Sequence, residues 1–210
     1  MLQIKRLVLA LLLFFAVDGG ARLWASHAIV ADMTYVCIDP ATNRYQFTLR
    51  FYRDCQGITP STPQLTFTST GGCGTIANVS MTQIGGTSTA GQVDVSQLCA
   101  TARSRCASPP GTNPGTGQWT YQATVTLPSG CNSWQVSYAE CCRTSAITNL
   151  TSPASNDIFI RTTLNTAAAP CNSSPQFSEV PVLYVCAGQQ AAYSHGAIDP
   201  DGDSLVYRLV

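Results

Sequence analysis

The sequence predicts an all-β protein in which a disulfide-rich β-sandwich is followed by the first strands of a second domain. Three observations support this prediction. Short runs rich in Thr, Val, Tyr and Phe recur along the chain, and several alternate with a period of two. Clusters of Gly, Pro, Asn and Ser separate these runs, as turns do. Ten cysteines lie after an N-terminal segment that is typical of exported proteins.

The N-terminal segment has the pattern of a secretory signal peptide. Lys5 and Arg6 precede an unbroken apolar run over residues 7–17, and small or polar residues follow. The run is much shorter than the ~20 residues that a membrane-spanning helix requires. We therefore interpret residues 1–25 as a signal peptide, with a retained anchor as the alternative. The mature chain is then secreted, begins between Arg22 and Ala28, and has no membrane-spanning segment.

The cysteines predict disulfide bonds. Their number is even, and thiols oxidise and stay oxidised outside the cytoplasm. A zinc site is the alternative, but such sites usually need two closely spaced cysteine pairs, which the chain lacks. We expect all of the cysteines to be oxidised, in a connectivity that spacing does not define. They are Cys37, Cys55, Cys73, Cys99, Cys106, Cys131, Cys141, Cys142, Cys171 and Cys186.

The charge pattern argues against a nucleic-acid partner. Leaving out Lys5, Arg6, Arg22 and Asp18 reduces the 11 basic and 11 acidic residues to eight arginines and ten acids. The mature chain therefore has a net charge of −2 and no basic patch that would neutralise phosphates.

Two segments show the alternation of a half-buried strand most clearly. In residues 45–52 the apolar side chains of Tyr45, Phe47, Leu49 and Phe51 share one face. Residues 119–127 alternate in the same way. Further strands are expected at residues 28–36, 64–68, 134–142, 158–163, 180–186 and 204–210.

Two stretches predict loops. Residues 71–91 are rich in Gly, Thr and Ser, and residues 106–117 contain three prolines, which excludes a central strand. The second loop needs an anchor, and Cys99 and Cys106, which bracket the sequence just before it, could form one.

Cys141 and Cys142 are adjacent in the predicted strand 134–142. Neighbouring side chains of a strand point to opposite faces, so we expect each cysteine to bond a different partner. A vicinal disulfide between them is the disfavoured alternative. A redox-active pair is also disfavoured, because such enzymes use a C-x-x-C spacing.

Asp199, Asp201 and Asp203 form the one cluster with metal-ligand chemistry. Bent by Pro200 and Gly202, three alternate carboxylates can converge on calcium, which takes about six to eight oxygen ligands. Three ligands are insufficient alone, so an acidic β-turn that leads into a strand is the alternative. We expect calcium as the cofactor of this turn in a longer protein.

The sequence does not predict an enzyme. The chain holds no recognisable nucleophile, zinc-protease or phosphate-binding motif. His195 precedes the acidic turn and is interpreted as a surface loop histidine, with a ligand or general base as the alternative. Glu140 is interpreted as a strand residue rather than a general acid.

A domain boundary is expected near residues 165–175, where small residues and prolines gather. Residues 26–168 then form the sandwich domain. Residues 169–210 hold three candidate strands, too few to close a second sandwich. We expect them to be the start of an incomplete domain in a protein that continues.

Five segments, in this order, resemble a known family: ASHAIVADMTY (25–35), FYRDC (51–55), ECCRTSAITNL (140–150), NSSPQF (172–177) and DPDGDSLVYRL (199–209). Together they resemble the N-terminal region of large secreted surface proteins of Bacteroidetes-type bacteria. Such proteins commonly continue into immunoglobulin-like or polycystic-kidney-disease-type repeats. Many end in a gliding-motility-associated or type IX secretion sorting domain.

The resemblance implies a location and a class more than a mechanism. It implies a cell-surface protein, an immunoglobulin/cadherin-like second domain, and calcium at the DPDGD turn. The sequence departs from the family at Thr144, where Asn is frequent, and it lacks the repeats and the sorting tail.

We therefore expect a non-catalytic structural or adhesive module of a secreted bacterial cell-surface protein, with other surface proteins or glycans as partners. A carbohydrate-binding module is the alternative, because Trp119, Tyr121, Trp134 and Tyr138 could form a platform on which sugars stack. Their alternating spacing favours packing in the core instead.

Overall fold

A computed structural model describes residues 27–86, 91–99, 101–181, 188, 190 and 192–209. Its regular structure is strand, apart from one short 3-10 turn at Pro153–Ser155. Within these residues no helix is long and apolar enough to cross a membrane. The predicted signal peptide over residues 1–25 lies outside the described residues.

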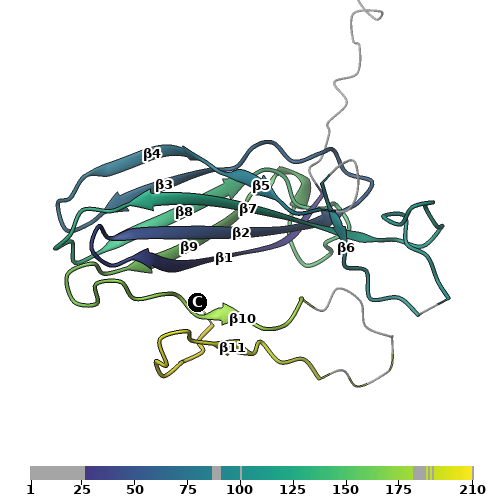
Figure 1. The fold of residues 1–210 in the computed structure, drawn as a ribbon. Helices are drawn as coiled ribbons and strands as arrows, with labels where there is room; N and C mark the ends of the chain where they lie inside the picture. The colour runs from purple at the N-terminus through teal and green to yellow at the C-terminus, as the bar shows by residue number, and fades with distance from the viewer. Residues whose placement is uncertain are drawn as a thin grey trace, which may run out of the picture.

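Two antiparallel sheets form the main body, as the sequence predicted (Figure 1). The first sheet has the order β1–β2–β7–β5, and β6 also pairs with β7. The second has the order β4–β3–β8–β9. The first sheet consists of β1 (Ala28–Asp39), β2 (Arg44–Asp54), β5 (Thr82–Ile84), β6 (Val93–Asp94) and β7 (Thr116–Thr126). The second consists of β3 (Gln64–Ser69), β4 (Thr75–Ser80), β8 (Trp134–Glu140) and β9 (Ile158–Leu164).

The core lies between the two sheets and follows the predicted alternation. Tyr45, Phe47, Leu49 and Phe51 of β2 are each at most 1% exposed. The Phe47 ring packs edge-on against Phe67 of β3, with ring centroids 5.0 Å apart, and so joins the first sheet to the second. These contacts confirm that the alternating face of β2 is the buried one.

The four aromatic residues of β7 and β8 that we considered for sugar binding belong to this core. Trp119, Tyr121, Trp134 and Tyr138 are at most 4% exposed. Their faces are therefore covered by the protein, and the expectation of core packing is confirmed.

Both loop predictions were partly wrong, because strands lie within them. β4 and β5 lie inside the predicted loop 71–91. Their side chains are mostly exposed, and a strand without a buried face has no alternating apolar pattern that the sequence could reveal. β7 begins at Thr116, within the predicted loop 106–117.

The C-terminal residues also differ from expectation. Residues 204–209 do not form a strand, since they pair with no strand of the described residues. Residues 180 and 181 are not in a strand either, and residues 182–186 and 210 lie outside the described chain. Instead, β10 (Gln176–Phe177) pairs with β11 (Ala197–Ile198) in a separate two-stranded sheet. The immunoglobulin/cadherin-like character of this region stays a prediction.

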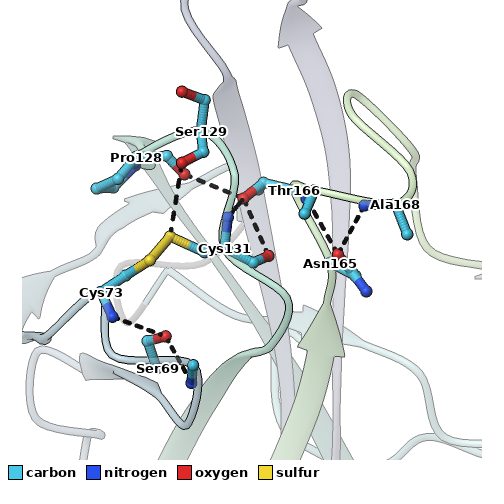
Figure 2. Close-up of a disulfide and its surroundings, with 10 residues drawn as sticks. Ser69, Cys73, Pro128, Ser129, Cys131, Asn165, Thr166 and Ala168 are labelled. Atoms are coloured by element: carbon cyan, nitrogen blue, oxygen red, sulfur yellow. Dashed lines mark hydrogen bonds between the residues drawn. A yellow bond between two sulfur atoms is a disulfide. The ribbon is translucent and has the colours of Figure 1, made fainter.

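Three disulfide bonds join distant parts of the chain. Cys37–Cys171 ties β1 to the segment after β9, and Cys55–Cys106 ties the end of β2 to the loop before β7. Cys73–Cys131 ties the β3–β4 turn to the β7–β8 loop (Figure 2). The buried hydroxyl of Thr166, which follows β9, accepts a hydrogen bond from the Cys131 amide in that loop.

The fourth bond is the vicinal disulfide Cys141–Cys142, so the expectation of separate partners was wrong. The reason is that β8 ends at Glu140, and the alternation of faces therefore does not extend to the two cysteines. They are joined by a cis peptide bond.

Cys99 differs from expectation as well. It is exposed and has no disulfide partner among the described cysteines, since Cys106, the anchor partner that we considered, bonds Cys55 instead. Cys186 lies outside the described residues.

Candidate functional site

A groove runs between the main body and the segment that follows it. β1 and β9 are edge strands of their sheets and lie on the same side of the molecule, with β10 and β11 beside β1 (Figure 1). The space between them has a volume of about 720 Å³, within the range of ~300–1,000 Å³ that is usual for ligand sites. We call it the edge groove. It is lined by Ile29, Val30, Ala31, Asp32, Met33, Ile160, Arg161, Thr162, Ser174, Pro175, Phe177, Glu179, Pro181, Tyr193 and His195.

The outer edge of β1 is occupied at both ends by the chain itself. At one end, the Ser174 amide donates to the Tyr35 carbonyl at 2.9 Å, and the Ser174 hydroxyl accepts from the Tyr35 amide at 2.8 Å. At the other end, the Ala28 amide donates to the Cys142 carbonyl, and the Ala28 carbonyl accepts from the Thr144 amide. Between these contacts the edge faces the groove.

Two residues of β1 present backbone groups to this groove. Because alternate residues of a strand direct their N–H and C=O groups to the same side, Ala31 and Met33 share the outward direction of Tyr35. In the described chain no backbone hydrogen bond joins either residue to a segment on that side. The edge groove therefore contains the open part of a sheet edge.

Several charged and aromatic side chains lie around the groove. The Asp32 carboxylate is 3.9 Å from Arg50 Nε on β2, and burial raises the pKa of that carboxyl, against the opposing effect of Arg50. Arg161 and Glu179 are exposed. The His195 ring packs edge-on against Tyr193, with centroids 4.6 Å apart. His195 is exposed, as expected of a surface histidine.

The acidic turn does not lie in the groove but secures the segment beside it. Asp199 Oδ1 accepts hydrogen bonds from the Asp201 and Asp203 amides at 2.9 and 3.2 Å, which closes the turn. Asp201 Oδ2 accepts from the Ser173 amide, and Asp203 Oδ2 accepts from Asn172 Nδ2 at 3.3 Å. The turn thus packs onto the residues that pair with β1.

These carboxylates are the calcium ligands that the sequence predicts. In the described part of the chain no group of three or more His, Cys, Asp or Glu residues is placed to hold a metal ion. Calcium at Asp199, Asp201 and Asp203 stays a prediction for a longer protein, in which further oxygen ligands would be needed.

A second cluster of polar residues closes one end of the core. Arg53 continues the buried face of β2 and is 0% exposed, with its guanidinium 5.7 Å from the centroid of the Trp119 ring. A Cβ at Gly57 would overlap this guanidinium, so a side chain there would have to displace it. Glu140, at the end of β8, accepts a hydrogen bond from the Tyr138 hydroxyl at 3.1 Å.

Sequence reasoning missed the burial of Arg53. The signal was present, because Arg53 falls two residues after Phe51 on the apolar face of β2. Arginine is rarely fully buried unless it is paired, so its residue type argues against burial. Here burial lowers the pKa of Arg53, and the charge of Glu140 opposes that shift, while the Trp119 ring faces the guanidinium.

Glu140→Gln is expected to change how stability depends on pH. Burial raises the pKa of the Glu140 carboxyl above its ordinary value of 4.5, although the Tyr138 hydrogen bond and Arg53 oppose the shift. A raised pKa means that the folded state holds the proton more tightly, so the stability that this residue contributes falls as pH rises through that pKa. As pH rises above about 4.5, the unfolding free energy of the unmodified chain should therefore fall relative to that of Glu140→Gln. Urea titrations at a series of pH values measure this difference, and a change in favour of the unmodified chain as pH rises would contradict the assignment.

Comparison with known proteins adds no identification. No family model, no curated protein and no solved structure matches the chain significantly. The resemblance to secreted surface proteins therefore stays a prediction. The four disulfides of the described residues are consistent with an extracellular protein.

Proposed function

We propose that this chain is a non-catalytic structural or adhesive module of a secreted cell-surface protein. The edge groove is the region through which it would contact its partner. The N-terminal signal pattern, the disulfides and the β-sandwich are the features that support the proposal.

The attachment of the segment after β9 to β1 is the main support for the proposal. The segment after β9 is fixed to β1 by the Cys37–Cys171 bond and by the contacts of Ser173 and Ser174. The acidic turn is then fixed to Ser173. Covalent and hydrogen-bonded attachment of this kind makes a firm joint, which suits a module that transmits load between a cell and a surface.

Carbohydrate binding is the less favoured function. It was based on Trp119, Tyr121, Trp134 and Tyr138, and a sugar can stack only on a ring face that it can reach. Since these four side chains are buried, they support the sandwich rather than a sugar platform.

A gene-replacement experiment tests the proposal in the source bacterium. Antibody against the folded chain should label intact cells, and deletion of the coding region should reduce attachment to a surface. The unmodified gene should restore attachment, and so should Cys99→Ser, which removes an exposed cysteine that forms no disulfide in the described residues. A gene carrying Cys37→Ser and Cys171→Ser should not. Labelling confined to permeabilised cells, or attachment that is unaffected by the deletion, would refute the proposal.

A further inference from the structure

The unpaired part of the β1 edge is short, and the chain itself is hydrogen-bonded to β1 on either side of it. It lies between Ala28, which bonds Cys142 and Thr144, and Tyr35, which bonds Ser174. In the described residues, pairing with this edge ends at Ser174, since residue 175 is proline and has no N–H to donate. After Pro175 the chain enters β10, which pairs with β11 instead. The backbone groups of Ala31 and Met33 are thus left facing the groove.

An unpaired strand edge is a template for another strand, because its N–H and C=O groups are already aligned. The apolar side chains of Ile29, Ile160 and Phe177 around this edge offer contacts for the alternating side chains of such a strand. Both parts of a strand-addition site are therefore present, namely backbone groups for affinity and a side-chain groove for selectivity.

We propose that the edge groove binds an extended peptide segment of a partner protein, which adds to β1 as a short strand. This inference rests on the proposed function and names the class of partner. The segment would span residues 29–34 and continue the pairing that Ser173 and Ser174 begin at Cys37 and Tyr35.

The shape of the groove favours a single peptide segment over a second copy of this chain. The groove is walled on the side away from β1 by Ser174, Pro175, Phe177, Glu179, Pro181, Tyr193 and His195. A sheet edge of a second copy would bring its neighbouring strands and would need open space there. A single extended segment needs only the groove itself.

Binding of model peptides to the mature chain tests the strand-addition geometry. The first probe is a six-residue peptide of alternating valine and threonine. Two further probes carry N-methyl groups either on the amides that face β1 or on those that face away, since alternate amides of an extended peptide point to opposite sides. Methylation on one of the two sides should weaken binding by about tenfold or more, and methylation on the other by much less. Equal effects of the two methylation patterns, or no binding of any peptide, would overturn the proposal.

Hydrogen exchange locates the bound peptide. Saturating peptide should slow exchange of the Ala31 and Met33 amides by about tenfold, since both would become hydrogen-bonded. Protection at the opposite edge of the first sheet, at Thr82–Ile84, would place the peptide elsewhere and overturn the proposal.

A matched pair of substitutions tests the groove wall. Phe177 lines the groove, Val93 does not, and both are 39% exposed on two-residue strands. Phe177→Lys should weaken peptide binding by about tenfold, whereas Val93→Lys should leave it within about twofold. If the chain instead forms dimers that Phe177→Lys disrupts, the occupant is a second copy and the proposal is wrong. Peptide binding is measured without cells, so its failure would leave the attachment experiment to decide the proposed function.

Discussion

Replacing Cys37 and Cys171 by serine is expected to lower the free energy of unfolding by about 4–5 kcal/mol. This bond closes a loop with a sequence separation of 134 residues, longer than those of Cys55–Cys106 and Cys73–Cys131, at 51 and 58. The entropy that a cross-link removes from the unfolded chain grows with the logarithm of loop length. The effect should therefore be the largest among the three long-range bonds.

Urea denaturation without reductant measures this loss, and Cys99→Ser is the control. Because Cys99 is exposed and has no disulfide partner in the described residues, its replacement should change the unfolding free energy by less than about 0.5 kcal/mol. If the double variant is as stable as the control, the bond either does not form or closes no loop in the unfolded chain.

The second large effect is expected at Phe47, whose replacement by alanine should cost about 3–5 kcal/mol. Phe47 is 0% exposed and contacts Tyr35 on β1 and Phe67 on β3, with ring centroids 5.5 and 5.0 Å away. Its removal takes away apolar burial and leaves a cavity between the two sheets, which rigid strands fill poorly. The same urea titration gives the value.

Phe159→Ala is the matched control for this prediction, because it removes the same side chain from a strand of the other sheet. Phe159 lies on β9 and is 62% exposed, so its loss should cost less than about 0.5 kcal/mol. Similar losses at the two positions would mean that the alternating face of β2 is not the core.

The two effects act on different parts of the molecule. Phe47 holds the sheets together, whereas Cys37–Cys171 also positions the segment that walls the edge groove. We therefore expect the cysteine variant to lose peptide binding even under conditions in which it remains folded.

The alternation of residues along the chain, by itself, determined the long strands and their buried faces. A strand has a period of two that depends only on local backbone geometry. The buried face of β2 could therefore be predicted without knowing which strands lie beside it, from the alternation of Tyr45, Phe47, Leu49 and Phe51. The same reasoning placed Trp119 and Trp134 in the core. It failed for β4 and β5, because exposed strands carry no apolar alternation, and only their hydrogen bonds to β3 and β7 define them.

Only the tertiary structure decided which cysteines meet, because pairing depends on the approach of segments far apart in sequence. It also showed that β8 ends before Cys141, which changes the pairing of two cysteines. The edge groove arises in the same way. Local sequence predicts that residues 28–36 form a strand, but the sheet order alone makes β1 an edge, and the turn at Pro175 leaves part of that edge open.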